Sequence, residues 1–327
     1  MHDRRSFLRG VASAAGACAL PQAIAQAGAW PTRPIRIIVP SNPGSGSDLV
    51  TRAFANYLQA RVKQSVYIDN KPGANTVIGA EAARHAEADG YTFFCSGASS
   101  HSASPALYSK LPYDPARDFI EVGLFGLFPY LVVVRKESPY KTVGELIDAA
   151  RAQPGKLSSG YGASSSQVPL ELLRVKAGVQ FLTASYRAAP QVVNDIAAGV
   201  IDFAIVPAMS GGTGGDAQNG VLRPIGVTSA ARAPGMPDIP AVAERLPGFV
   251  YEGWVGLSAP TGTPRAIVEQ MNRHVRDSLA HPAMRKTIEQ LGLATEARTL
   301  AQQAEYTAAH RQSFAEMVRT ADIKRIN

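Results

Sequence analysis

Short apolar runs alternate along the chain with helical patterns, and loops rich in glycine, proline and serine separate them. The run at residues 35–39 is mainly β-branched and predicts a buried strand, and apolar residues at 49–58 then recur at helical spacing. Strands that alternate with helices are typical of an α/β fold with a parallel sheet. We expect strands at 35–39, 66–68, 91–95, 131–134, 201–206 and 221–227, and helices at 49–58, 77–86, 142–153, 166–176 and 190–198.

The chain changes character after residue 263, where helical patterns follow one another without an intervening strand. Thr263 precedes Pro264, which is the usual order of an N-cap and a proline at the first helical position. We therefore expect a helix to begin at Pro264 and further helices at 283–291 and 300–318.

Length and charge narrow the class of protein. A chain of 327 residues has room for about two domains, at roughly 150 residues per domain. The formal net charge is +7, but the basic residues are scattered as singles and pairs. A nucleic-acid-binding surface needs a basic cluster, so we expect no nucleic-acid partner and at most a mild attraction of anions.

The first 27 residues read as an export signal. The pair Arg4-Arg5 precedes an apolar stretch at 11–24, and Ala25-Gln26-Ala27 follows as a cleavage site. Paired arginines before Ser-Phe-Leu are typical of the twin-arginine route. Cleavage near Ala27 leaves Cys95 as the one cysteine, so an intramolecular disulfide is excluded. Cys95 ends the apolar run at 91–95, which predicts a small buried side chain rather than a nucleophile.

Three loops rich in small hydroxyl residues and glycine follow predicted strands, at 41–48, 96–102 and 158–166. Ligands of open α/β sheets bind at the carboxyl ends of strands, and a free helix start favours an anion. Uncharged donors of this kind suit a carboxylate. The competing interpretation is that these residues are ordinary turns and caps; Asp48, at one helix start, has a structural explanation as a partner of Arg52 four residues later.

Motifs of enzymes and metal sites are missing from the sequence. It contains neither a G-x-S-x-G elbow nor a G-x-x-x-x-G-K-[ST] loop, and its six histidines form no H-E-x-x-H. We expect no metal and no cofactor. His101 is the one histidine that falls in a candidate ligand loop.

The order of several motifs resembles the extracytoplasmic solute-binding proteins of the tripartite tricarboxylate transporter family, often called Bug proteins. The matching stretches are 30–40, 43–48, 70–74, 88–92, 105–119, 154–157, 226–229, 259–264 and 291–292. The resemblance implies a periplasmic-binding-protein type II fold, with two α/β lobes around a ligand cleft and two crossover strands. It places residues 28–131 plus 252–327 in one lobe and 132–251 in the other.

The resemblance also implies a function and a site. The expected protein is periplasmic and monomeric, binds a small carboxylate and delivers it to a two-component membrane permease. The residues expected to bind the ligand are Ser41, Gly44, Ser45, Gly46, Ser47, Ser96, His101, Ser164, Ser165, Ser166, Tyr186 and Arg187. Two alternatives stay open: an exported enzyme, either a serine hydrolase or a cofactor-dependent oxidoreductase, and a sensor subunit that presents a ligand to a membrane kinase.

Overall fold

The computed structural model describes residues 30–186, 189–210, 220–233 and 236–326. The strands are β1 (Ile35–Val39), β2 (Val66–Asn70), β3 (Thr92–Gly97), β4 (Phe119–Arg135), β5 (Ser158–Tyr161), β6 (Leu182–Ser185), β7 (Phe203–Pro207), β8 (Leu222–Val227) and β9 (Glu252–Pro260). The longer helices are α1 (Gly46–Val62), α2 (Val77–Arg84), α5 (Val143–Ala152), α6 (Ser164–Ala177), α7 (Ala189–Ala197), α9 (Arg265–Ser278), α10 (Pro282–Gln290) and α11 (Leu300–Thr320). The short ones are η1 (Ala74–Thr76), η2 (Ser99–Ala103), α3 (Ser104–Leu107), α4 (Pro115–Asp118), η3 (Ala208–Ser210) and α8 (Val242–Arg245).

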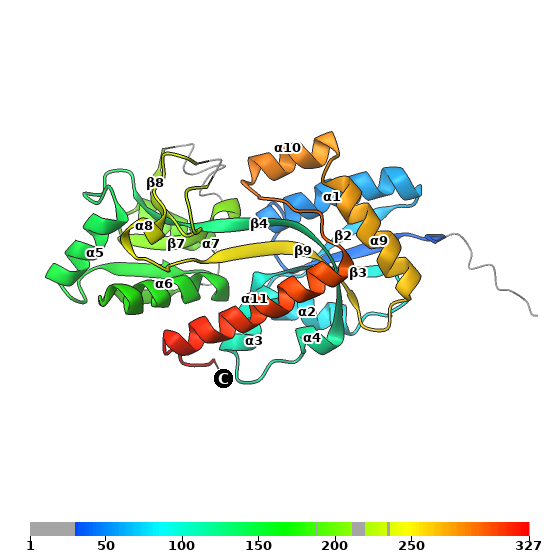
Figure 1. The fold of residues 1–327 in the computed structure, drawn as a ribbon, viewed down its shortest axis with the longest axis horizontal. Coiled ribbons are helices and arrows are strands. Elements are labelled where there is room, and N and C mark those ends of the chain that lie inside the picture. The colour runs from blue at the N-terminus through cyan, green and yellow to red at the C-terminus, as the bar shows by residue number, and fades with distance from the viewer. Residues whose placement is uncertain (1–29, 187–188, 211–219, 234–235, 327) are drawn as a thin grey trace, which may run out of the picture.

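Two α/β lobes lie side by side, and the long strands β4 and β9 extend from one lobe into the other (Figure 1). The first lobe contains β1 to β3 with α1, α2, α9 and α10. The second lobe contains β5 to β8 with α5 to α8. Helix α11, red in Figure 1, runs alongside both lobes and contacts β4 and α6.

The strands form one sheet in the order β2-β1-β3-β9-β4-β7-β5-β6, and β8 also pairs with β4. Strands β1, β2 and β3 are parallel, and so are β5, β6 and β7. The middle of the sheet is antiparallel, because β9 runs against β3 and β4, and β4 runs against β7 and β8. The prediction of a parallel sheet is therefore right for β1 to β3 and for β5 to β7, and wrong for β4, β8 and β9.

Strand β4 is much longer than the predicted strand at 131–134. Its first part pairs with β9 from Phe119 to Pro129, and its last part pairs with β7 from Tyr130 onwards. The register shifts near Gly123 and Gly126, where β-bulges interrupt the two-residue alternation. A single strand thus serves both lobes, and its change of partner falls between Pro129 and Tyr130.

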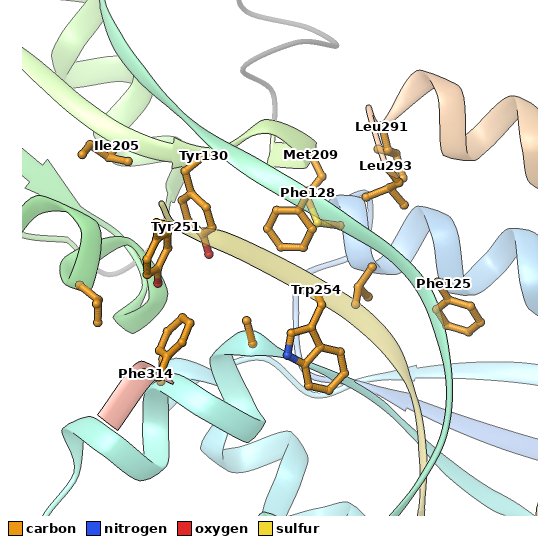
Figure 2. Packing of buried hydrophobic residues seen from close by; sticks show 14 of the residues in the cluster. Phe125, Phe128, Tyr130, Ile205, Met209, Tyr251, Trp254, Leu291, Leu293 and Phe314 are labelled. Carbon is orange, nitrogen blue, oxygen red and sulfur yellow. The ribbon is translucent and has the colours of Figure 1, made fainter. Parts of the chain in front are cut away.

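Buried aromatic side chains fill the place where the two crossing strands lie together. Figure 2 shows Phe128 and Tyr130 of β4 beside Tyr251 and Trp254, which come from the other crossing segment. The rings of Tyr130 and Tyr251 meet edge to face at 4.8 Å, and Phe314 of α11 lies 5.2 Å from Tyr251. The hydrophobic core therefore continues from one lobe into the other.

Local signals predicted most helix ends correctly. Thr142 caps α5, its hydroxyl accepting the Glu145 N–H at 3.1 Å. Helix α9 starts at Arg265, one residue later than expected, and Pro264 is its N-cap. The reason is that the Thr263 hydroxyl donates to the Pro260 carbonyl at 2.7 Å instead of capping the helix.

Cys95 is 2% exposed, and burial raises the pKa of its thiol to about 12. The Thr51 hydroxyl donates to its sulfur at 3.2 Å. The interpretation of Cys95 as a buried structural side chain is confirmed. Across the described ranges, no helix combines the length and apolar character that crossing a membrane requires.

Candidate functional site

The first candidate loop ends in a cluster of three serine hydroxyls at the start of α1. Ser45 is the N-cap of the helix, and its side chain accepts the Asp48 N–H. The Ser41 hydroxyl lies 2.7 Å from that of Ser45 and 2.8 Å from that of Ser47. Gly44 has a φ of +81°, a conformation that other residues rarely adopt. This turn therefore holds several small donors close together at a helix N-terminus.

The buried carboxylate of Asp48 stabilises this loop through hydrogen bonds. Its carboxylate is 1% exposed and accepts hydrogen bonds from the Gly44 N–H at 2.9 Å, Asn70 Nδ2 at 2.8 Å and Arg52 Nε at 2.8 Å. Burial alone would raise the pKa of Asp48, but these hydrogen bonds together outweigh it and lower the pKa. The predicted pair with Arg52 is confirmed, and the negative charge is engaged by the loop's own supports.

The second candidate loop, expected at 96–102, consists mainly of the end of β3 and a helical turn. Ser96 lies within β3 and is 1% exposed. Residues Ser99–Ala103 form a wide helical turn, η2. The Tyr113 hydroxyl supports this turn by donating to the Ser100 carbonyl at 2.7 Å. The turn presents Ser99, whose hydroxyl donates to Ser165 of the second lobe at 3.0 Å.

His101 points into the first lobe. Its ring is completely buried and packs against Phe94, Phe119 and Trp254. Burial, and secondly the charge of Arg311, lower the pKa of His101 to about 3, so the ring is neutral at ordinary pH. The structure does not bring this side chain to the serine residues at the starts of α1 and α6, which we call the serine turns. Its role in ligand binding stays a prediction.

A serine, a histidine and an acid do meet beneath η2. The Ser100 hydroxyl lies 2.9 Å from His101 Nδ1, and Glu121 Oε1 lies 3.7 Å from His101 Nε2. These residues are 1%, 0% and 7% exposed, respectively. A hydrolase needs its nucleophile within reach of the substrate, so this buried arrangement gives the hydrolase alternative no support.

The environment of Glu121 predicts that the stability of the protein depends on pH. Desolvation by burial raises its pKa to about 8, so the folded state keeps a proton that the unfolded chain loses near pH 4.5. Stability must then fall as pH rises through this window, by on the order of 1 kcal/mol per pH unit. His101 has the opposite effect, but only below about pH 6.5, the ordinary histidine pKa.

We therefore expect the free energy of unfolding to decrease between pH 6.5 and 8 in the parent protein and to stay nearly constant in Glu121→Gln. Urea titrations at both pH values measure this difference. An equal decrease in the two proteins would assign the slope to another group.

The third candidate loop begins as strand β5 and ends at the start of α6. Helix α6 has 14 residues, and Ala163 at its N-cap offers no side-chain acceptor. Ser164, Ser165 and Ser166 are at most 4% exposed. The Ser164 hydroxyl is buried without a hydrogen-bond partner in the described part of the chain. A helix start with small hydroxyls and an uncapped first turn favours an anion.

The two lobes touch where these turns meet. Besides the Ser99–Ser165 hydrogen bond, Gly46 at the start of α1 lies against Met209 of η3 in the second lobe. A Cβ atom at Gly46 would stand 2.5 Å from the Met209 carbonyl oxygen, closer than any real contact. The approach of the lobes at this point therefore requires glycine.

Tyr186 lies between β5, at the beginning of the third candidate loop, and Asp195 of α7. Its hydroxyl donates to Asp195 Oδ2 at 2.7 Å, and its ring lies over Gly160 of β5. Burial and the nearby Asp195 charge raise the pKa of Tyr186 to about 12. Arg187, the expected charged ligand contact, lies outside the described residues, as do the export signal at 1–27 and its cleavage site.

Sequence reasoning missed the residues that support the turns. Met209, Tyr113 and Tyr251 all contact them from distant parts of the chain, and no local pattern indicates such contacts. Asp48 was recognised as a partner of Arg52, but its bond to the Gly44 N–H was not foreseen.

Comparison with known proteins assigns a family. A family model described as tripartite tricarboxylate transporter family receptor matches residues 50–321. A relative from Pseudomonas sp. (strain P51), the UPF0065 protein in the tcbD-tcbE intergenic region, is 34% identical over 274 residues, which cover 82% of this chain and 80% of that protein.

Two solved structures with the same fold are named as complexes with a carboxylate. "R. palustris Rpa4515 with adipate" has a TM-score of 0.86 and 29% identity and covers 91% of this chain and 100% of that one. "MatC (Rpa3494) from Rhodopseudomonas palustris with bound malate" has a TM-score of 0.80 and 26% identity and covers 88% and 100%. The two-lobed fold and the resemblance found in the sequence are thereby confirmed: the chain belongs to the tripartite tricarboxylate transporter family of receptors.

Proposed function

We propose that this protein is a periplasmic receptor that captures a small carboxylate between its lobes and delivers it to a two-component permease of the tripartite tricarboxylate type. The observation that carries the proposal is that serine-bearing turns of the two lobes lie at their contact: Ser99 of η2 bonds to Ser165 at the start of α6, and Gly46 at the start of α1 lies against Met209. The structural relatives named with adipate and with bound malate support the ligand class.

The chemistry of the turns fits a carboxylate. Uncharged hydroxyls and the free N–H groups of a helix start stabilise an anion without a fixed ion pair. Asp48 presents no free charge there, because the loop and Arg52 engage its carboxylate. We place the carboxylate between the hydroxyls of Ser41, Ser45 and Ser47 on one side and those of Ser164 and Ser166 on the other.

A thermal-shift and calorimetric screen tests the function. The mature chain would be titrated with adipate, malate, citrate and benzoate, with 1,6-hexanediol as the uncharged control for adipate. A ligand at 100 times its Kd should add about 2.7 kcal/mol of stability. Shifts with a nucleotide or flavin, and none with any carboxylate, would refute the proposal.

Arg187 is proposed as the charged contact of the second lobe, because a guanidinium binds a carboxylate through two parallel hydrogen bonds. Arg187→Ala should weaken binding of the carboxylate about tenfold or more, while the melting temperature without ligand changes little. Parallel calorimetry and thermal unfolding separate the two effects. Unchanged affinity would remove Arg187 from the site.

The remaining parts of the proposal concern export and organisation. We propose twin-arginine export with cleavage near Ala27, a monomer in solution, and lobes composed of residues 28–131 plus 252–327 and of 132–251. The mass of the protein recovered from the periplasm tests the cleavage site, and its sedimentation behaviour tests the monomer. Limited proteolysis that releases fragments inconsistent with these boundaries would contradict the division.

A further inference from the structure

One buried threonine forms hydrogen bonds to both segments that pass between the lobes, β4 and the chain at the start of β9, which we call the crossing segments. Thr228 follows β8, is completely buried, and lies between Tyr130 of β4 and Tyr251, the residue before β9. Its N–H donates to the Tyr130 carbonyl at 2.9 Å, and its carbonyl accepts the Tyr251 N–H at 2.9 Å. We call Tyr130, Thr228 and Tyr251 the Thr228 joint.

The hydroxyl of Thr228 completes this arrangement. It accepts the Tyr130 N–H at 2.8 Å and lies 2.5 Å from the Tyr251 carbonyl and 3.2 Å from that of Tyr130. A hydroxyl has one proton to donate, and the shorter distance assigns it to Tyr251. All polar groups of Thr228 are thus used to hold the two crossing segments against the second lobe.

The Thr228 joint reaches the candidate ligand site through Tyr251. The Tyr251 hydroxyl donates to the carbonyl of Ser165, in the first turn of α6. The ring of Tyr251 is held between those of Tyr130 and Phe314, and Figure 2 shows these three side chains together. The start of α6 is therefore tied to the crossing segments, and not only to its own lobe.

We propose that Thr228 is a positioning residue, which holds Tyr251 so that the start of α6 meets the first-lobe turns in binding geometry. This inference rests on the proposed function, and Thr228 itself touches no ligand. Tyr130 and Tyr251 are fixed to the second lobe. Movement of the lobes must therefore bend β4 at Pro129 or earlier in the chain, and β9 at Glu252 or later. A receptor whose binding-competent state is less populated loses affinity by the same factor.

The test compares Thr228→Val with Thr228→Ser. Valine keeps the shape and both backbone hydrogen bonds but removes the hydroxyl, whereas serine retains it. Thr307→Val is the matched control, because Thr307 is also buried and its hydroxyl bonds only within α11. Adipate, or whichever screened carboxylate binds the parent best, serves as the probe.

We expect about tenfold weaker binding in Thr228→Val, and affinities within about twofold of the parent in Thr228→Ser and Thr307→Val. Without ligand, hydrogen exchange at the Tyr130 amide should be at least about tenfold faster in Thr228→Val alone, because that amide loses its acceptor. Unchanged exchange would refute the joint, and faster exchange with unchanged affinity would refute its positioning role. If the parent binds no carboxylate, the proposed function fails, while the joint is still judged by the exchange rate.

Discussion

Gly46→Val is expected to bind carboxylate about 100-fold more weakly than the parent protein while remaining folded. A Cβ atom at this position would lie 2.5 Å from the Met209 carbonyl oxygen, which belongs to the backbone of the other lobe and has little freedom to move. Overpacking of this kind costs about 1–3 kcal/mol, and each 1.4 kcal/mol is a factor of ten in affinity. The lobes can escape the clash by separating at this contact, while the buried rings of Tyr130 and Tyr251 still join them.

Calorimetry and thermal unfolding on the same samples measure the two consequences. Gly144→Ala is the matched control, because Gly144 lies in the first turn of α5 and a Cβ atom there finds its nearest neighbour at 3.5 Å. It should bind like the parent and melt slightly higher, since alanine favours a helix. Parent-like affinity in Gly46→Val would show that binding does not require the two lobes to meet at Met209.

Asp48→Ala is expected to destabilise the protein by about 3 kcal/mol and to weaken carboxylate binding at least tenfold. The substitution leaves the Gly44 N–H, Asn70 and Arg52 without their shared acceptor. A buried donor left unpaired costs about 1–3 kcal/mol, and Arg52, whose side chain is 46% exposed, loses least. The serine turn in front of α1 then loses the support that fixes its shape. Asp48→Asn, which retains an acceptor oxygen, should lose less of both.

Asp118→Ala separates stability from binding. Asp118 is also a poorly exposed carboxylate, held by Arg84, Arg117 and the Asp114 N–H at the end of α4, and none of these partners belongs to the turns before α1 and α6. Denaturant unfolding should show a loss of stability in this variant, and calorimetry should show affinity within about twofold of the parent. If Asp48→Ala loses stability but keeps its affinity, Asp48 supports the fold and not the ligand turn.

The sequence predicted those strands that carry a strong apolar signal. All of β1 except Arg36 is completely buried, and its β-branched run made it legible. The first part of β4 was missed because Gly123 and Gly126 interrupt its alternation at the bulges. Strand β6 was missed because its four residues are all exposed, so hydrogen bonding to β5 and not burial makes it a strand.

The candidate site was predictable only as far as local chemistry reaches. Serine and glycine before an apolar helical pattern correctly indicated the starts of α1 and α6. His101 shows the limit, because its place in a serine loop gave no sign that its ring packs against Phe94 and Trp254, and its expected role in ligand binding stays a prediction. The contact of Gly46 with Met209 depends on the relative placement of two lobes, which no local pattern encodes.

The position of β9 between β3 and β4 sets the order in which a nascent chain can complete its lobes. All strands of the second lobe lie in one uninterrupted stretch with β4, so they can assemble while the ribosome is still at work. The first lobe must wait for residues 252–260, long after its own opening strands have been synthesised. During that interval its unfinished sheet leaves the edge of β3 without its partner β9, and an unpaired edge can pair with another chain.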